Sequence, residues 1–382
     1  MTFLLLAQTR RGKNMDKMTG LRTMAIGAAF AGFWLPVAGQ AEDSWVDKIS
    51  FKGDFRPRLE YIDRDADSVG APVDEQRRGR FRARLGMTAE VNDDVDFVFE
   101  LATGGENPVS TNQSFDGGFT RKDIGVNLAY VSWHATDDLD VQIGKLKNPW
   151  YRAGDHHLVW DSDLNPEGIF LDFERGGFFG SFGGLAVEER STTDDTLLYS
   201  LQGGYEFRIS EKGSLTAGVS YYAYTNMVGN SPFWEGVPFG NTVDANGDFV
   251  YDYRMIEGFA EFATTLGGLP FHIFVDYIRN TEAPEFDTGY AFGAGIGKVS
   301  QPGDWEASIA YTDLEKDALV ALFTDSDFGG GGTDASGFTI KGKYGLSKRW
   351  DFGGTLFVNE IEENIGSPTD YLRLQIDFEF KF

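Results

Sequence analysis

The sequence has 382 residues, no cysteine, 48 glycines, 15% aromatic residues and a formal net charge of −25. The lack of cysteine excludes a disulfide framework and thiolate metal sites. The acidic balance argues against nucleic acid as a partner, because nucleic-acid binding requires a basic surface. The mean hydropathy is −0.29 and no long apolar run follows Ala41, which excludes a bundle of membrane-spanning helices.

Residues 1–41 have the pattern of a secretory signal peptide. An apolar run at 24–37 is followed by small residues up to Ala41. The basic residues that precede the run are Arg10, Arg11, Lys13, Lys17 and Arg22. The run is too short for a membrane anchor, which needs roughly 20 apolar residues. We therefore predict export, cleavage after Ala41, and a single domain over residues 42–382.

The first predicted strands, 49–61, 78–91 and 95–103, alternate apolar and polar side chains with the period of two that is typical of strands. Phe51 and Phe55 lie on the apolar face of the first strand. Six arginines of the first two strands share the opposite face, and they are Arg56, Arg58, Arg78, Arg80, Arg82 and Arg84. One side of this sheet is therefore apolar and the other is strongly basic.

Alternation continues along the rest of the chain, although the facing is ambiguous at 124–135 and 178–184. The further predicted strands are 124–135, 139–147, 169–174, 178–188, 196–209, 214–224, 253–265, 271–280, 288–298, 305–312, 338–346 and 350–359. In the last one, 371–382, alternate residues from Leu372 to Phe382 are apolar and those between them are polar or charged. A helical period would scatter these phenylalanines around the axis.

Short and long connections alternate between these strands. The short ones are 92–94, 136–138, 210–213, 301–304 and 347–349, and the long ones are 62–77, 104–123, 148–168, 225–252, 313–337 and 361–370. An apolar outer face, a charged inner face and this alternation are typical of outer-membrane barrels. We predict an all-β fold, a transmembrane antiparallel β-barrel of about 16 strands with short periplasmic turns and long extracellular loops.

Three stretches resemble the Gram-negative outer-membrane putative porin family, a relative of the trimeric general porins. They are Gly-Lys-Leu-Lys-Asn-Pro at 144–149, Trp-Asp-Ser-Asp-Leu-Asn-Pro-Glu-Gly at 160–168, and the segment 317–334 with its run of four glycines. With the terminal Phe382, the resemblance covers essentially the whole mature chain. It implies a water-filled channel in the outer membrane, in contact with lipid and lipopolysaccharide and assembled as a homotrimer.

The same resemblance assigns roles to two segments. In general porins the loop at 148–168 folds into the lumen, so its acidic residues, Asp155, Asp161, Asp163 and Glu167, are candidates for a constriction. The alternative for this loop is a solvated extracellular position. The residues Phe378, Phe380 and Phe382 resemble the signal recognised by the barrel-assembly machinery. The one-sided apolar pattern of residues 314–323 predicts a short helix, which either gates the mouth of the channel or packs inside a long loop.

Cations on the inner face form a candidate pore-lining wall, because each would cost roughly 2–4 kcal/mol facing lipid near the midplane. The wall comprises Arg56, Arg58, Arg78, Arg80, Arg82, Arg84, Lys341, Lys343 and Arg373. Carboxylates on neighbouring strands, Glu60, Glu90, Asp96 and Glu100, could neutralise it. Otherwise the wall and the acidic loop would create a transverse field that favours anions at the narrow zone.

Other chemistry is weakly supported. Asp244, Asn246, Asp248 and Asp252 place oxygens as in a calcium loop, but Phe249 and Met255 break the pattern, so we expect a solvated turn and no metal. No histidine lies near a serine in a nucleophile motif, so we expect neither an enzyme nor a cofactor. The sequence predicts a porin for passive diffusion of small hydrophilic solutes and ions. The alternatives are a channel specific for anions or organic acids, and an occluded structural or adhesin barrel.

Overall fold

The computed structural model describes residues 45–65 and 75–382. The predicted signal peptide, with its cleavage site at Ala41, lies outside the described residues. The chain divides into two units, Met1–Lys48 and Ile49–Phe382. Of the first unit the structure describes a single 3-10 turn, η2 (Trp45–Lys48). The second unit contains all the strands and is described below.

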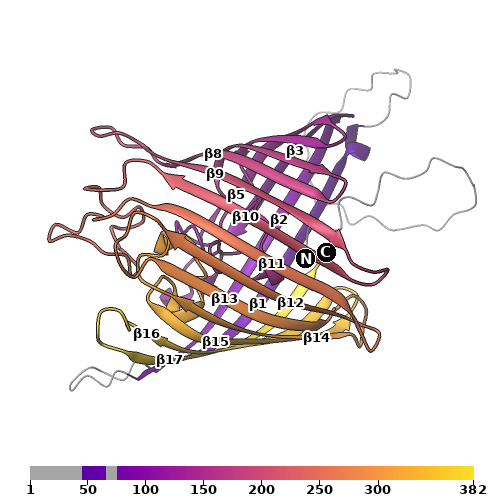
Figure 1. Cartoon of the computed structure of the whole chain (residues 1–382). Coiled ribbons are helices and arrows are strands. Elements are labelled where there is room, and N and C mark those ends of the chain that lie inside the picture. The colour runs from indigo at the N-terminus through magenta and orange to yellow at the C-terminus, as the bar shows by residue number, and fades with distance from the viewer. Residues whose placement is uncertain (1–44, 66–74) are drawn as a thin grey trace, which may run out of the picture. The chain divides into compact units, whose positions relative to one another are not determined.

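Sixteen strands form a closed antiparallel ring, which confirms the predicted fold class (Figure 1). The strands are β1 (Ile49–Asp65), β2 (Gln76–Asn92), β3 (Val95–Thr103), β5 (Ile124–Thr136), β6 (Leu139–Lys145), β7 (Glu167–Arg175), β8 (Phe178–Glu188), β9 (Thr196–Arg208), β10 (Ser214–Tyr224), β11 (Arg254–Leu266), β12 (Leu269–Asn280), β13 (Thr288–Gly297), β14 (Trp305–Leu314), β15 (Ala335–Ser347), β16 (Trp350–Ile361) and β17 (Thr369–Lys381). A further short strand, β4 (Gln113–Ser114), pairs with β2 only. Among the described residues, no helix is long and apolar enough to cross a membrane.

The first and last strands close the ring. β17 pairs with β1 from Asp54↔Lys381 to Asp65↔Asp370. At the end of this seam the backbone groups of Phe382 and Gly53 exchange two hydrogen bonds, of 2.9 and 3.0 Å. The Phe382 ring lies over Gly53, where a Cβ atom would collide with it. The phenylalanine at the end of the chain therefore takes part in barrel closure.

Side-chain facing follows the predicted alternation and settles the two ambiguous stretches. On β5, Leu128 and Ser132 are buried on the inner face, while Trp133 is exposed on the outer face. On β8, Ser181 and Leu185 point inward and Phe182 points outward. A register shift in the pairing of β5 with β3, between Glu100 and Leu101, explains why simple alternation fails there.

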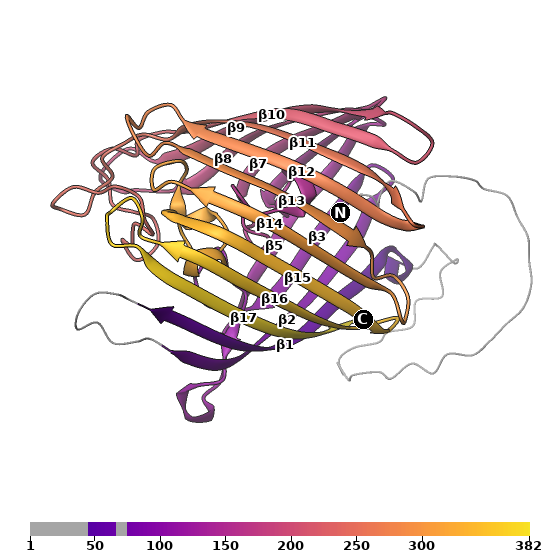
Figure 2. The same cartoon turned by 60° about the horizontal axis from the view of Figure 1, so that its bottom comes forward.

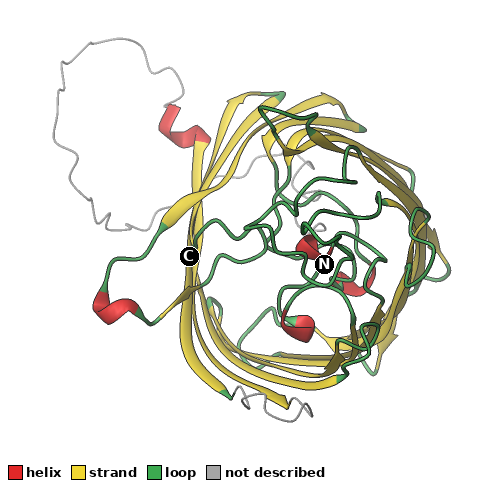
Figure 3. Ribbon diagram, turned by 90° about the vertical axis from the view of Figure 1, so that its left-hand side faces the viewer, coloured by secondary structure: helices red, strands yellow, loops and turns green. Residues whose placement is uncertain are grey.

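Long connections emerge at one end of the barrel, here called the loop end, and short turns at the other, the turn end. The long loops that matter for the lumen are L2 (104–123), L3 (146–166), L5 (225–253) and L7 (315–334). Viewed along the barrel, loops fill much of the space inside the ring of strands (Figure 3). The interior is therefore shaped by these loops as much as by the strands.

The helix predicted at 314–323 is wrong. β14 continues to Leu314, and only a 3-10 turn, η5 (Ala321–Phe323), follows. The amide of Asn241 in L5 donates to the carbonyls of Lys316 and Leu319 and accepts from the N–H of Ala321. These contacts with L5 occupy the backbone groups that a helix would have paired internally.

Candidate functional site

L3 lies inside the barrel and follows the inner wall from β9 to β14. The main-chain N–H of Tyr151 donates to Gln202 at 2.7 Å. The Tyr151 hydroxyl and the N–H of Gly154 both donate to Glu261 on β11, each at 2.8 Å. A ring nitrogen of His156 lies 2.9 Å from the Thr312 hydroxyl on β14. L3 is thus held in the lumen by polar contacts with several strands.

Two tryptophans make the apolar core of this arrangement. The rings of Trp150 and Trp160 stack with centroids 4.2 Å apart, and both side chains are buried. Tyr222 on β10 contacts both rings edge-on. Gly154 has a φ of +64° and lies against the ring of Phe274, so a side chain there would be strained and would clash. This half of L3 therefore packs as a layer against the inner face of the barrel.

L7 also enters the lumen and binds L3 along its length. The N–H of Asp161 donates to the carbonyl of Phe323 at 2.8 Å, and the N–H of Ser326 donates to the Asp161 carboxylate at 2.8 Å. The Thr324 hydroxyl donates to the carbonyl of Leu158 at 2.8 Å. The two loops therefore behave as one hydrogen-bonded body.

An Asp-Ser-Asp repeat occurs in each loop, at 161–163 and 325–327. In each copy the first carboxylate accepts a hydrogen bond from the N–H of the second aspartate, at 2.7 Å in L3 and 2.9 Å in L7. This local turn, common for aspartate, directs the second carboxylate away from its own loop. The second aspartates, Asp163 and Asp327, face the basic wall.

Both L3 and L7 contact the basic wall. Asp327 lies 2.6 Å from Arg373 and 3.1 Å from Arg58, and both arginines are nearly inaccessible to solvent. Asp163 lies 3.9 Å from both Arg82 and Arg84. The carboxylate of Asp163 also accepts hydrogen bonds from the N–H and hydroxyl of Thr111 in L2. The loops therefore reach across the lumen and contact the arginines directly.

The charges of these loop residues respond to burial and to the arginines. Burial alone would raise the pKa of Asp163, but Arg82 and Arg84 lower it to about 2. Burial opposes Arg373 and Arg58 at Asp327, and the arginines keep its pKa well below the ordinary value. Burial and then neighbouring carboxylates raise the pKa of Asp161. The second aspartate of each repeat is therefore ionised at neutral pH and paired with the wall.

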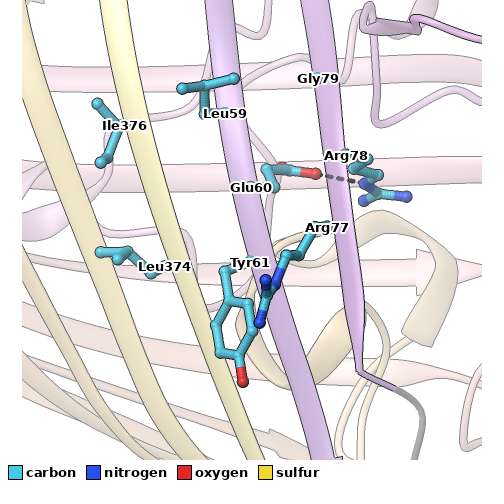
Figure 4. A pocket seen from close by; sticks show the side chains of 8 residues that line it. All are labelled: Leu59, Glu60, Tyr61, Arg77, Arg78, Gly79, Leu374 and Ile376. Atoms are coloured by element: carbon cyan, nitrogen blue, oxygen red, sulfur yellow. Dashed lines mark hydrogen bonds and ion pairs between the residues drawn. The ribbon is translucent and has the colours of Figure 1, made fainter.

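Carboxylates on the strands neutralise much of the remaining wall. Glu60, whose side chain is completely buried, pairs with Arg78 (Figure 4) and with Arg373. Asp54 pairs with Arg82 at 2.9 Å and Arg84 at 2.7 Å. Of the four carboxylates considered from the sequence, Glu60 is the one within 4 Å of a wall arginine in the described part of the chain. Asp54, Asp377 and Glu379 share the inner face of β1 and β17, so the alternation could have indicated them.

The remaining candidates occupy different environments. Arg56 and Arg80 donate to Asn112 and Ser110 of L2, at 2.8 and 3.3 Å. Lys343 lies 3.8 Å from Glu306 and 3.9 Å from Glu379. Glu167 stands at the start of β7, on the same face as the exposed Ile169, and pairs with Lys145 at 2.8 Å. Glu167 is thus on the outer face of the barrel, away from the other three acidic residues of the predicted constriction.

The segment at 244–252 forms a turn. The Asp244 carboxylate accepts hydrogen bonds from the N–H groups of Asn246 and Asp248, and a bridge joins Val243 to Phe249. In the described residues, no group of three or more acidic, histidine or cysteine side chains could hold a metal ion.

Comparison with known families identifies this architecture. A family model described as putative porin matches residues 67–235 and 242–382. The chain belongs to the putative porin family. Family and fold establish a porin-type channel of the outer membrane and point to a channel rather than an enzyme.

Solved structures resemble this porin in fold. The high-pH structure of OprB from Pseudomonas putida has a TM-score of 0.58 and 12% identity, over 88% of this chain and 95% of that one. A triple mutant of the porin from Rhodopseudomonas blastica has a TM-score of 0.48 and 12% identity, over 87% and 100%. A comparison with curated protein sequences finds no match. At 12% identity, the OprB structure shows the fold alone.

Proposed function

We propose that this porin supports passive diffusion of small hydrophilic solutes and ions. The observation that carries the proposal is a closed ring with ionised side chains on its inner face and apolar ones on its outer face. Such an interior is hydrated, because charged groups that are not paired need water. L3 and L7 narrow the interior, and we infer that solutes pass beside them. We also infer that residues 1–41 are removed on export and that the assembly machinery inserts the barrel into the lipopolysaccharide-containing membrane.

Planar-bilayer recording tests this function. The purified protein should produce stepwise, ohmic conductance increases in potassium chloride. Conductance that saturates with one organic anion, while other solutes do not compete, would instead establish the specific channel. The rival to a diffusion channel that the buried core between L3, L5 and L7 supports is the occluded barrel. A folded protein without conductance would establish that rival.

We further propose a homotrimer in which the side of the barrel with the shortest strands, β3, β6 and β7, faces a second copy. β6 has only 7 residues, and β3 and β7 have 9 each. A tilted strand needs about 9–11 residues to cross the hydrocarbon layer, so β6 is too short to face lipid alone. The tip of L2, which pairs with β2 next to β3, stands clear of the strands (violet, at the bottom of Figure 2). It carries the fully exposed Phe119, and Phe115 packs over Gly79 and Phe81.

Crosslinking of intact membranes checks the assembly. The wild-type porin should crosslink as trimers. The double substitution Phe115→Ser and Phe119→Ser should reduce the trimer fraction, because exposed aromatic anchors contribute strongly to interfaces. Phe207→Ser, which removes an exposed outer phenylalanine from β9, is the matched control. Equal trimer fractions in both variants would exclude L2 as an interface.

A further inference from the structure

The side of L3 that faces neither L7 nor the basic wall carries cations. Its acidic residues Asp161 and Asp163 are turned into the contacts with L7 and with the basic wall. Lys147, at the start of the same loop, is exposed to solvent. Its amino group donates to the carbonyl of Ser162 at 3.3 Å, and no carboxylate of the described residues lies within 4 Å of it. Since Ser162 belongs to the part of L3 inside the ring, this exposure is to the lumen.

Two further cations lie near the same loop. Arg152 is half-buried and pairs with the exposed Asp155 at 3.1 Å. Lys341 is half-buried on the inner face of β15, with no carboxylate within 4 Å in the part of the chain that is described. Burial, then Arg152 and Lys341, lower the pKa of His157, so both cations act on this histidine.

Lys147 is electrostatically coupled to Arg152 as well. Although its amino group reaches water, the surrounding protein lowers its pKa and the positive charges of Arg84 and Arg152 lower it further, against the opposite effect of Asp163 and Glu100. The charge of Arg152 therefore acts on both Lys147 and His157. His156 and His157 are uncharged at neutral pH, because burial and these cations lower the pKa of His156 to about 3 and that of His157 well below its ordinary value.

We propose that Lys147, Arg152 and Lys341 form the selecting element of the channel, and that the solutes it favours are small anions. Arg58, Arg82 and Arg373 of the wall contribute less, since carboxylates at 2.6–3.1 Å already compensate them. Asp155 pairs with Arg152 and also acts on Lys341, so one exposed carboxylate stands against three cations and a net positive charge faces the water. Charge in a narrow, low-dielectric lumen concentrates counter-ions and sets selectivity. The inference rests on the proposed channel function.

Reversal potentials in a potassium chloride gradient test the inference. The wild-type porin should be more permeable to chloride than to potassium. The double substitution Lys147→Glu and Lys341→Glu should reverse this order, with a larger change at low salt, where screening is weaker. The matched control is Lys212→Glu with Lys348→Glu, because both lysines are exposed in short turns and the change in net charge is the same.

The outcomes separate the two proposals. A folded wild-type porin without conductance would overturn the channel function itself. Conductance with a preference for potassium, or an unchanged permeability ratio in the Lys147→Glu, Lys341→Glu variant, would overturn the selecting element alone. Heat-modifiable migration on gels verifies that each variant is folded. An equal shift in the control would assign selectivity to the overall charge of the protein.

Discussion

Replacing Asp327 with asparagine is expected to release L7 from the barrel wall and to raise the single-channel conductance. Asp327 joins L7 to Arg58 and Arg373, and removing one partner of a buried ion pair leaves the others uncompensated at a cost of about 3–5 kcal/mol. Arg58 keeps Asp377 and Arg373 keeps Glu60, so we expect the lower end of that range. Single-channel recording and the temperature at which the compact gel form disappears measure both effects.

Asp325→Asn is the matched control for this change. Asp325 belongs to the same repeat, but it caps its own loop and lies 3.8 Å from His157, without an arginine partner in the described chain. Its conductance should stay near that of the wild type. If Asp327→Asn also leaves conductance unchanged, L7 does not narrow the path.

The pH dependence of the loop contacts has a defined sign. A carboxylate whose pKa is lowered by folding stabilises the protein above its ordinary pKa, and this contribution is lost as the pH falls to the lowered value. Asp163, with a pKa of about 2, and Asp327, which is also lowered, therefore hold the loops throughout the range from about 4 to 8. The loop contacts should fail only in strong acid.

The fold could be predicted from the sequence because alternation is a local property. Each stretch of apolar and polar residues defines its own two faces, as in 371–382, and one face of a barrel strand must be apolar. Strand ends were less predictable. The predicted strand at 139–147 ends at Lys145, because Leu146 and the residues after it enter the lumen as L3.

The partners of the basic wall could not be predicted in full. The period of two indicates which residues share a face, but it cannot indicate which carboxylate reaches which arginine. Asp327 contacts Arg58 and Arg373 only because L7 crosses the lumen. The repeated Asp-Ser-Asp at 161–163 and 325–327 was visible in the sequence, yet its meaning depends on the hydrogen bonds between the two loops.

The second large effect is expected at Phe382, which we propose as part of the assembly signal with Phe378 and Phe380. Deleting Phe382 removes its ring and both backbone hydrogen bonds with Gly53, so closure against β1 is lost at the seam. The deleted protein should accumulate in the periplasm without the compact, heat-modifiable gel form.

Phe382→Ala separates recognition from closure, because it keeps the two backbone hydrogen bonds and removes only the ring. If the ring is a recognition element, this variant should fold in detergent at nearly wild-type yield and should still fail to assemble in cells. Phe382→Tyr retains an aromatic ring and should assemble normally. Poor folding of Phe382→Ala in detergent as well would mean that the ring acts by sealing Gly53, and normal assembly of the alanine variant in cells would remove the proposed signal.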